Sequence, residues 1–135
     1  MISEESMQEI DHIAVIVHDA DRSAQYYCER FGLRRAYDEE LEELKVRLVH
    51  LEAGDVFLQL VQPTGPGPLM DDLSISGDSL HHICFRVARV DGFLSTMPGE
   101  ANTSTFVGGG GRRACFLRNP PAGMRIELIE GALGT

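Results

Sequence analysis

Basic residues are scarce in this sequence relative to acidic ones. The 12 Lys and Arg residues stand against 21 Asp and Glu, which gives a formal net charge of −9 at pH 7 over 135 residues. Nucleic-acid binding needs a basic surface, so this charge argues against a nucleic acid as partner. An anionic small molecule is not excluded, because a few local arginines can dominate a pocket. The candidates, each of which taken alone is an ordinary solvated side chain, are Arg86, Arg112, Arg113 and Arg118.

Long apolar runs and cysteine motifs are also missing. No run of about 18 apolar residues is present, so we expect no membrane-spanning helix. The segment from Met1 to Glu9 is acidic and polar, without the basic start and apolar block of a signal peptide. Cys28, Cys84 and Cys115 have no CxxC spacing, and the last two lie within apolar runs. We therefore expect free thiols and a cytoplasmic protein without disulfides.

An internal repeat predicts how the chain is organised. The octets Ile10–Val17 and Leu80–Val87 match in character, with His12 and His82 at the same place in each. A second pair of matching segments consists of residues 57–62 and 125–130. Two copies with so long a period indicate a duplicated module that folds onto itself, not a solenoid.

The order of sequence patterns predicts an α+β fold made of two βαβββ modules within one domain. The first module spans residues 9–63, a Pro- and Gly-rich linker spans 64–78, and the second module spans 79–131. Strands are expected at 10–17, 33–37, 45–52 and 56–61, and again at 80–87, 103–107, 113–118 and 124–130. A helix capped by Asp19 or Asp21 and ended by Gly32 belongs to the first module. Asp91 is expected to cap a shorter helix in the second.

Three segments are expected to be irregular. The acidic segment Asp38–Glu43 is typical of a solvated loop. Residues 69–73 of the linker favour a short helical turn. The run Gly108–Gly111 indicates a mobile loop over the site; a phosphate cradle is the alternative, but no helix or Lys-Ser/Thr follows as in a P-loop.

Four polar residues stand at repeated positions within apolar strands. His12 and His82 lie on the first strand of each module, and Gln59 and Glu127 lie between apolar neighbours on the last strand. Any one of them alone is an ordinary residue. If the modules pack as pseudo-twofold copies, the four side chains converge on one point. Two imidazoles, an amide oxygen and a carboxylate suit a divalent first-row ion, so we expect a Co, Mn, Ni or Zn site completed by water or substrate oxygens.

Segments spread over nearly the whole chain resemble the vicinal oxygen chelate superfamily, which includes glyoxalase I and the extradiol dioxygenases. Within it they are most similar to the methylmalonyl-CoA epimerases, and the His81-His82 pair after a Pro-rich linker is typical of that group. The segments that carry the resemblance are Ile10–Ala14, Tyr26–Tyr27, Phe31–Leu33, Gln59–Pro63, Leu80–Ile83, Phe85–Val87 and Ile126–Leu128.

The resemblance implies a glyoxalase-like fold, in which a curled mixed sheet surrounds a cavity shared by the two modules. It implies the same four metal ligands, a homodimer, and a small-molecule substrate such as an acyl-CoA thioester. The implied activity is epimerisation, in which a proton is moved next to a carbonyl with acid/base groups on both faces. Glu127 matches one of these groups.

The second base departs from the pattern of the epimerases. Our alignment places Leu48 where a Glu would serve, and a leucine cannot carry a proton. His50, two residues further on the same strand face, either replaces it as the second catalytic residue or is a surface histidine near the hairpin. His81 is expected to face outward or to lie behind His82.

Two other kinds of function remain open. One is a different metalloenzyme of the superfamily, such as a glyoxalase I-like lyase or a dioxygenase. Gln59 as a fourth ligand argues against the two-His, one-carboxylate Fe(II) site of dioxygenases. The other is a non-catalytic binding or resistance protein, a class that usually lacks the metal ligands present here.

Overall fold

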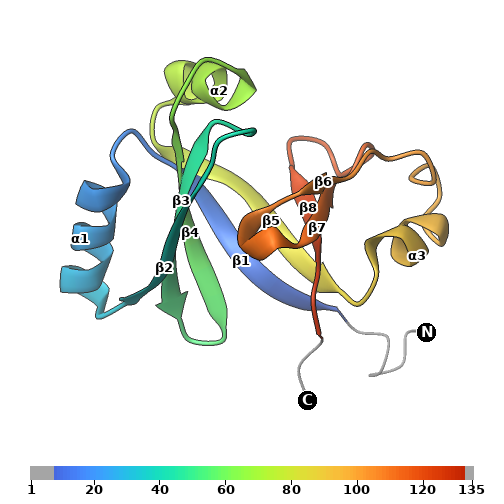
Figure 1. Cartoon of the computed structure of the whole chain (residues 1–135), viewed down its shortest axis with the longest axis horizontal. Helices are drawn as coiled ribbons and strands as arrows, with labels where there is room; N and C mark the ends of the chain where they lie inside the picture. The colour runs from blue at the N-terminus through green and yellow to red at the C-terminus, as the bar shows by residue number, and fades with distance from the viewer. Residues whose placement is uncertain (1–7, 133–135) are drawn as a thin grey trace. The chain divides into compact units, whose positions relative to one another are not determined.

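A computed structural model describes residues 8–132 of the chain (Figure 1). Residues 1–7, on which much of the signal-peptide argument rests, lie outside the described part. The elements in order are β1 (Glu9–Ile16), α1 (Ala20–Phe31), β2 (Arg34–Leu41), β3 (Val46–Ala53), β4 (Val56–Pro63), α2 (Pro68–Ser76), β5 (Ser79–Val87), α3 (Val90–Ser95), β6 (Phe106–Val107), the 3-10 helix η2 (Gly109–Gly111), β7 (Arg113–Phe116) and β8 (Ile126–Glu130). Within residues 8–132, none of the helices has the length and apolar content needed to cross a membrane.

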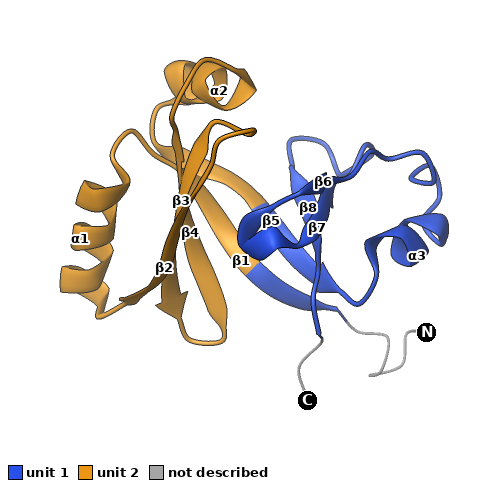
Figure 2. Cartoon of the chain, in the orientation of Figure 1, with its two compact units in different colours: residues 1–11, 83–135 blue, residues 12–82 orange. Residues whose placement is uncertain are grey.

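The chain divides into two compact units (Figure 2). Unit 2 is the continuous segment 12–82, and the described part of unit 1 combines residues 8–11 with residues 83–132. The divisions fall inside β1 and β5, so each of these strands contributes to both units. The expected module boundaries at 9–63 and 79–131 remain a prediction.

Both units use the same arrangement of strands. In unit 2, β3 lies between β2 and β4 with antiparallel pairing, and β4 is parallel to β1. In unit 1, β7 lies between β6 and β8 with antiparallel pairing, and β8 is parallel to β5. Each mixed sheet follows the order that a βαβββ sequence produces, which confirms the predicted α+β fold class.

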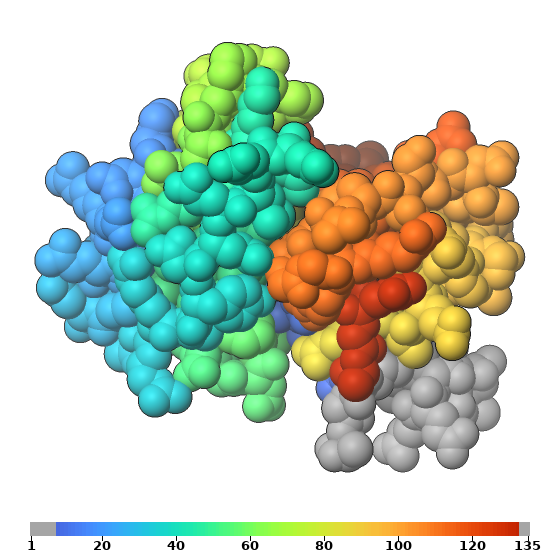
Figure 3. Space-filling view, in the orientation of Figure 1, coloured from blue at the N-terminus to red at the C-terminus, as the bar shows by residue number. Residues whose placement is uncertain are grey.

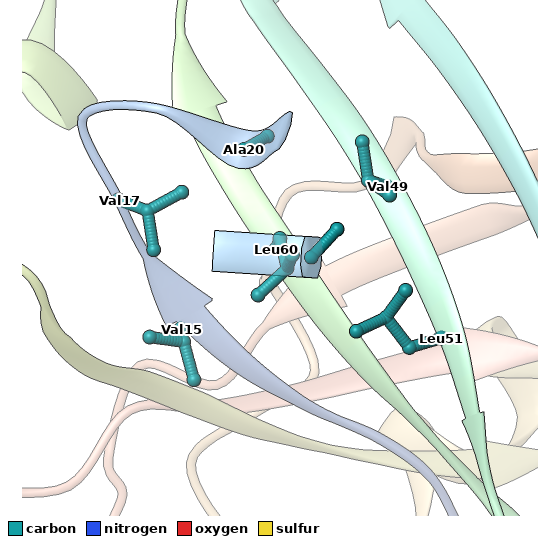
Figure 4. Close-up of a cluster of buried hydrophobic side chains, with 7 residues drawn as sticks. Val15, Val17, Ala20, Val49, Leu51 and Leu60 are labelled. Atoms are coloured by element: carbon teal, nitrogen blue, oxygen red, sulfur yellow. The ribbon is translucent and has the colours of Figure 1, made fainter. Parts of the chain in front are cut away.

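The helix α1 packs on one face of the unit 2 sheet. Asp19 caps its N-terminus by accepting a hydrogen bond from the backbone N–H of Arg22, and Gly32 ends it in the left-handed conformation at φ 69°. Buried apolar residues of α1, β1, β3 and β4 form the core between helix and sheet (Figure 4): Val15, Val17, Ala20, Ala24, Val49, Leu51 and Leu60. Because strand side chains alternate, the opposite face of β1 carries His12, Ala14 and Ile16.

The expected acidic loop is wrong in four of its six residues. Residues 38–41 extend β2, and Asp38 pairs in register with Val49 of β3. The β2 segment lies on the surface of unit 2, in cyan in Figure 3, and most of its residues are exposed. Arg47 donates hydrogen bonds to Asp38 and Asp21 at 2.7–3.0 Å, and this ion pairing lowers the pKa of Asp38. Neutralisation by an adjacent strand therefore offsets the repulsion that favoured a loop.

Other local expectations need correction as well. The linker holds a full helix, α2, whose first turn begins at Pro68, where a missing N–H has no cost. Arg89 stands at the N-cap of α3 and Asp91 in its first turn, where Asp91 accepts a hydrogen bond from Arg113 at 3.0 Å. Gly108–Gly111 is irregular as expected, since Gly110 within the short segment η2 has a left-handed backbone at φ 68°, while its mobility remains a prediction.

Candidate functional site

Two of the four predicted metal ligands meet inside unit 2. The Nε2 atoms of His12 on β1 and His82 on β5 lie 3.2 Å apart. His12 is buried, with 1% of its surface exposed, and His82 is half-buried. The ring planes are inclined by 75° with centroids 5.3 Å apart, and the contact between the rings is made by the two Nε2 atoms.

This geometry fits a shared cation. Two neutral imidazoles that present lone pairs at this distance repel unless a proton or a metal ion lies between them. With metal–nitrogen bonds of about 2.1 Å and angles of about 90–109°, two ligating nitrogens stand about 3.0–3.4 Å apart. The observed 3.2 Å separation falls in this range. The donor types and their spacing therefore fit a metal site, and they also fit a hydrogen bond between the two rings.

The third predicted ligand, Gln59, is also in unit 2 and is held by His50. Gln59 on β4 is 5% exposed, and its amide nitrogen donates a hydrogen bond to Nε2 of His50 at 3.0 Å. The two residues are directly opposite each other in the β3–β4 register. Because the amide nitrogen is committed to His50, the carbonyl oxygen is the atom of Gln59 that remains to bind a metal.

His50 is a buried residue. It is 1% exposed, its ring stacks on Tyr37 with centroids 4.1 Å apart, and it meets His12 edge to face at 6.1 Å. The alternative of a surface histidine is therefore wrong. The reason is the position of β3 between β2 and β4, which the sequence does not specify. Leu48, on the same strand face, is buried in an apolar cluster with Ala14, Val46 and Val61.

His81 lies behind His82. The Nδ1 atoms of the two rings are 2.8 Å apart, and Nε2 of His81 is 3.3 Å from a carboxylate oxygen of Asp72 on α2. His81 is 9% exposed, so the expectation that it faces outward is wrong, and the alternative expectation is confirmed. Sequence reasoning missed Asp72 and Tyr37, because nothing local to either residue marks the packing that brings it to a histidine.

The fourth predicted ligand, Glu127, belongs to unit 1. It lies on β8, is 6% exposed and stands directly opposite Cys84 of β5. Burial, reinforced by the charges of Glu127 and Asp11, raises the pKa of the Cys84 thiol far above its ordinary range. Cys84 is therefore a protonated thiol at neutral pH, and not a nucleophile.

The two units place their polar residues at equivalent register positions. In the β1–β4 pair, Gln59 is opposite Ala14, the second residue after His12. In the β5–β8 pair, Glu127 is opposite Cys84, the second residue after His82. Directly opposed residues share a sheet face, as do residues two apart on one strand. Each parallel pair therefore directs one histidine and one amide or carboxylate to a common face.

Three of the four candidate arginines are occupied by carboxylates of unit 1. Asp11 is 3% exposed and accepts two hydrogen bonds from Arg112, at 3.0 and 3.2 Å, and its Oδ1 lies 3.2 Å from Nε of Arg86. Arg113 pairs with Asp91. Arg86 and Arg112 thus neutralise a buried carboxylate, which gives them a structural role whatever else they bind.

The sequence profile of the Glyoxalase/Bleomycin resistance protein/Dioxygenase superfamily matches residues 11–116. The chain therefore belongs to this superfamily, as the resemblance of its motifs indicated. Among curated proteins, Uncharacterized protein YqjC of Bacillus subtilis (strain 168) is 35% identical over 80 residues. The match covers 58% of this chain and 57% of YqjC, so it spans little more than half the length of that relative.

Similar solved structures include methylmalonyl-CoA epimerases. One in complex with methylmalonyl-CoA and NH4+ is 29% identical with a TM-score of 0.83, over 94% of this chain and 96% of that chain. A Streptomyces coelicolor variant in complex with 2-nitronate-propionyl-CoA is 28% identical with a TM-score of 0.83, over 96% and 99%. The enzyme of Mycobacterium tuberculosis, 21% identical with a TM-score of 0.82 over 91% and 87%, shares the fold. These likenesses confirm the glyoxalase-like fold.

Proposed function

We propose that this protein is a metal-dependent epimerase that moves a proton α to the carbonyl of an acyl-CoA thioester, of the methylmalonyl-CoA epimerase type. The observation that carries the proposal is the repeated register, which pairs each histidine strand with a strand bearing Gln59 or Glu127. Similar structures hold methylmalonyl-CoA or 2-nitronate-propionyl-CoA, which supports a thioester of this class as substrate. We expect the enzyme to work as a homodimer, as the resemblance implies, and in the cytoplasm, as the cysteine pattern indicates.

The proposed metal ligands are His12, Gln59, His82 and Glu127. The 3.2 Å approach of the two imidazole nitrogens and the orientation of the Gln59 amide support the first three. Glu127 is included because it holds in the second repeat the place that Gln59 holds in the first. When bound, a divalent ion polarises the carbonyl oxygen of the substrate and stabilises the negative charge that develops on it.

Glu127 is the proposed base on one face of the substrate. Its carboxylate takes the α-proton, and the electron pair of the broken C–H bond moves toward the carbonyl to give the enolate. Inversion requires a proton to be delivered to the opposite face, so a second acid/base group is needed. The adjacent Cys84 cannot be that group, because its thiol stays protonated and lies on the same strand pair as Glu127.

His50 is the proposed group on the opposite face. Leu48 carries no proton, whereas His50 is an imidazole on the same face of β3 that contacts Gln59 and lies against the ring of His12. Its Nε2 accepts from Gln59, so the neutral ring carries its proton on Nδ1. In this tautomer the Nδ1–H of His50 is the proposed donor to the enolate, and the imidazolate that donation leaves takes a proton from water.

Solvent-deuterium exchange at C2 of methylmalonyl-type thioesters tests the function, with and without added Co²⁺ or Mn²⁺. Both enantiomers should exchange only when metal is present. His82→Ala should lose stoichiometric metal by elemental analysis, while His18→Ala, which changes an exposed histidine, should keep it. Absence of exchange in the metal-loaded wild type on every such thioester would reject the epimerase and leave a lyase or a binding protein.

The role of His50 is tested on single enantiomers. In His50→Gln, epimerisation should fall by about 10²–10⁴-fold, the usual contribution of general acid–base catalysis. Exchange into one enantiomer should survive, because Glu127 still works on its own face. Equal loss of exchange from both enantiomers would instead show that His50 acts only by holding Gln59.

A further inference from the structure

We infer that Asp72 and His81 set the tautomer of His82 and thereby raise the affinity of the metal site. This inference rests on the proposed metal-binding function. It assigns a role to the helix between the two repeats, which the proposed reaction does not otherwise use. Three contacts carry it, all within unit 2: Asp72 to His81, His81 to His82, and His82 to His12.

When both histidines are neutral, the protons along this chain of contacts can be placed by elimination. A histidine that ligates a metal through Nε2 presents a lone pair there, so His82 must carry its proton on Nδ1. The nearest ring nitrogen is Nδ1 of His81, at 2.8 Å, which must then act as acceptor. His81 consequently carries its proton on Nε2, which faces a carboxylate oxygen of Asp72 at 3.3 Å. A carboxylate only accepts hydrogen bonds, so each contact has one donor and one acceptor.

The opposite placement of protons is unfavourable for the metal. If His81 carried its proton on Nδ1, its Nε2 lone pair would face the carboxylate of Asp72. His82 would then have to accept at Nδ1 and carry its own proton on Nε2, where it blocks the metal. Asp72 disfavours this arrangement by electrostatic repulsion. A carboxylate that fixes a ligating histidine through hydrogen bonds is a recurrent device, and its loss costs about 10–100-fold in metal affinity.

The position of Asp72 is fixed by the packing of α2. Its neighbour Leu73 is buried, and Leu69 packs on the cluster that contains Ala14 and Leu48. At the far end, the hydroxyl groups of Ser76 and Ser79 are 3.0 Å apart and join the end of α2 to the start of β5. The carboxylate is therefore held against His81 from both ends of the helix.

Metal affinity separates the inferred role from a general effect of charge. Co²⁺ affinity, measured by competition with a chromophoric chelator, should fall about 10–100-fold in Asp72→Ala. Asp71→Ala removes the same charge from the preceding residue of α2, which is exposed, and this variant should bind Co²⁺ as tightly as the wild type does. Asp72→Asn keeps an acceptor for His81 and should lose less than the alanine variant. Equal affinity of Asp72→Ala and wild type would overturn the inference.

A spectroscopic measurement on the metal-free protein provides a second readout. Long-range ¹H–¹⁵N correlations should show His82 protonated at Nδ1 and His81 at Nε2 in the wild type, and a mixture of tautomers in Asp72→Ala. If the wild type has the opposite tautomers, the inference is wrong. If it has the expected tautomers but binds no Co²⁺, the proposed function fails while the hydrogen-bond order stands.

Discussion

Glu100 is a buried carboxylate, 2% exposed, outside the proposed site. It accepts hydrogen bonds from the backbone N–H groups of Arg118 and Asn119, both at 2.9 Å, and from the hydroxyl of Thr103 at 2.7 Å. Burial opposes ionisation, but these donors outweigh it, and the pKa of Glu100 lies below its ordinary value. The ionised carboxylate thus organises the turn that follows β7.

We expect Glu100→Gln to lower the free energy of unfolding by about 2–3 kcal/mol at pH 7, since hydrogen bonds to a charged acceptor are lost. The pKa is lowered in the folded state. The stabilisation is therefore complete above the unfolded value of about 4.3 and is lost as the pH falls through the folded pKa. Urea unfolding at pH 7 and at pH 3 measures this. A difference between wild type and variant that stays constant with pH would contradict it.

At the scale of single residues, the sequence marked the candidate ligands, which remain a prediction, more readily than the residues around them. His12, Gln59 and His82 were marked by the repeat, and the structure places the two histidines and the Gln59–His50 pair in unit 2. The burial of His50 and the contact of Asp72 were not predictable. Both depend on which strand or helix lies alongside, and a residue pattern fixes the period of an element but not its neighbour.

The helix α1 illustrates a prediction at the scale of an element. The backbone N–H groups in the first turn of a helix have no partner within the helix. In α1 the side chain of Asp19 accepts a hydrogen bond from one of them, the N–H of Arg22, at 3.0 Å. Asp19→Ala should therefore cost about 1 kcal/mol, or about 3–5 °C in Tm. Asp19→Ser keeps an acceptor and should cost much less. Thermal unfolding of the wild type and the two variants measures the difference in Tm. An equal loss of Tm in both variants would contradict the capping role of Asp19.

Among the elements, regular strands were predicted well and short or charged ones poorly. The β-branched segments of β1, β3 and β5 alternate with clear turn signals, so their positions followed from the sequence. The predicted strand ends before the observed β2 does, because its carboxylates suggest mutual repulsion. Arg47 on the neighbouring strand offsets this repulsion by pairing with Asp38. The strand β6 is only two residues long, too short for any periodicity to be seen.

At the scale of the whole molecule, the two repeats should not fold apart. Division of the chain at Pro66 would separate residues 67–82 from the rest of unit 2. It would also separate Asp11 from Arg86 and Arg112, its partners in unit 1. Repeats of this size also bury little surface on their own.

We expect neither fragment to give a cooperative thermal transition by circular dichroism, whereas the intact chain should melt in one. The intact protein, purified in the same buffer, is the reference. Two monomeric fragments that each unfold cooperatively would disprove the interdependence of the repeats.

Unit 1 is built from two segments that are far apart in the chain, and this has a consequence for synthesis on the ribosome. Asp11 is made before its partner Arg112, which lies 101 residues later in the chain. Unit 2 is continuous, so all of its residues are available before those of unit 1 are complete. At about 5–20 residues per second, several seconds pass between the emergence of the two partners. Synthesis from the N-terminus therefore favours unit 2 as the first part to fold. The start of β1 stays without its unit 1 partners until residues 83–132 have been made.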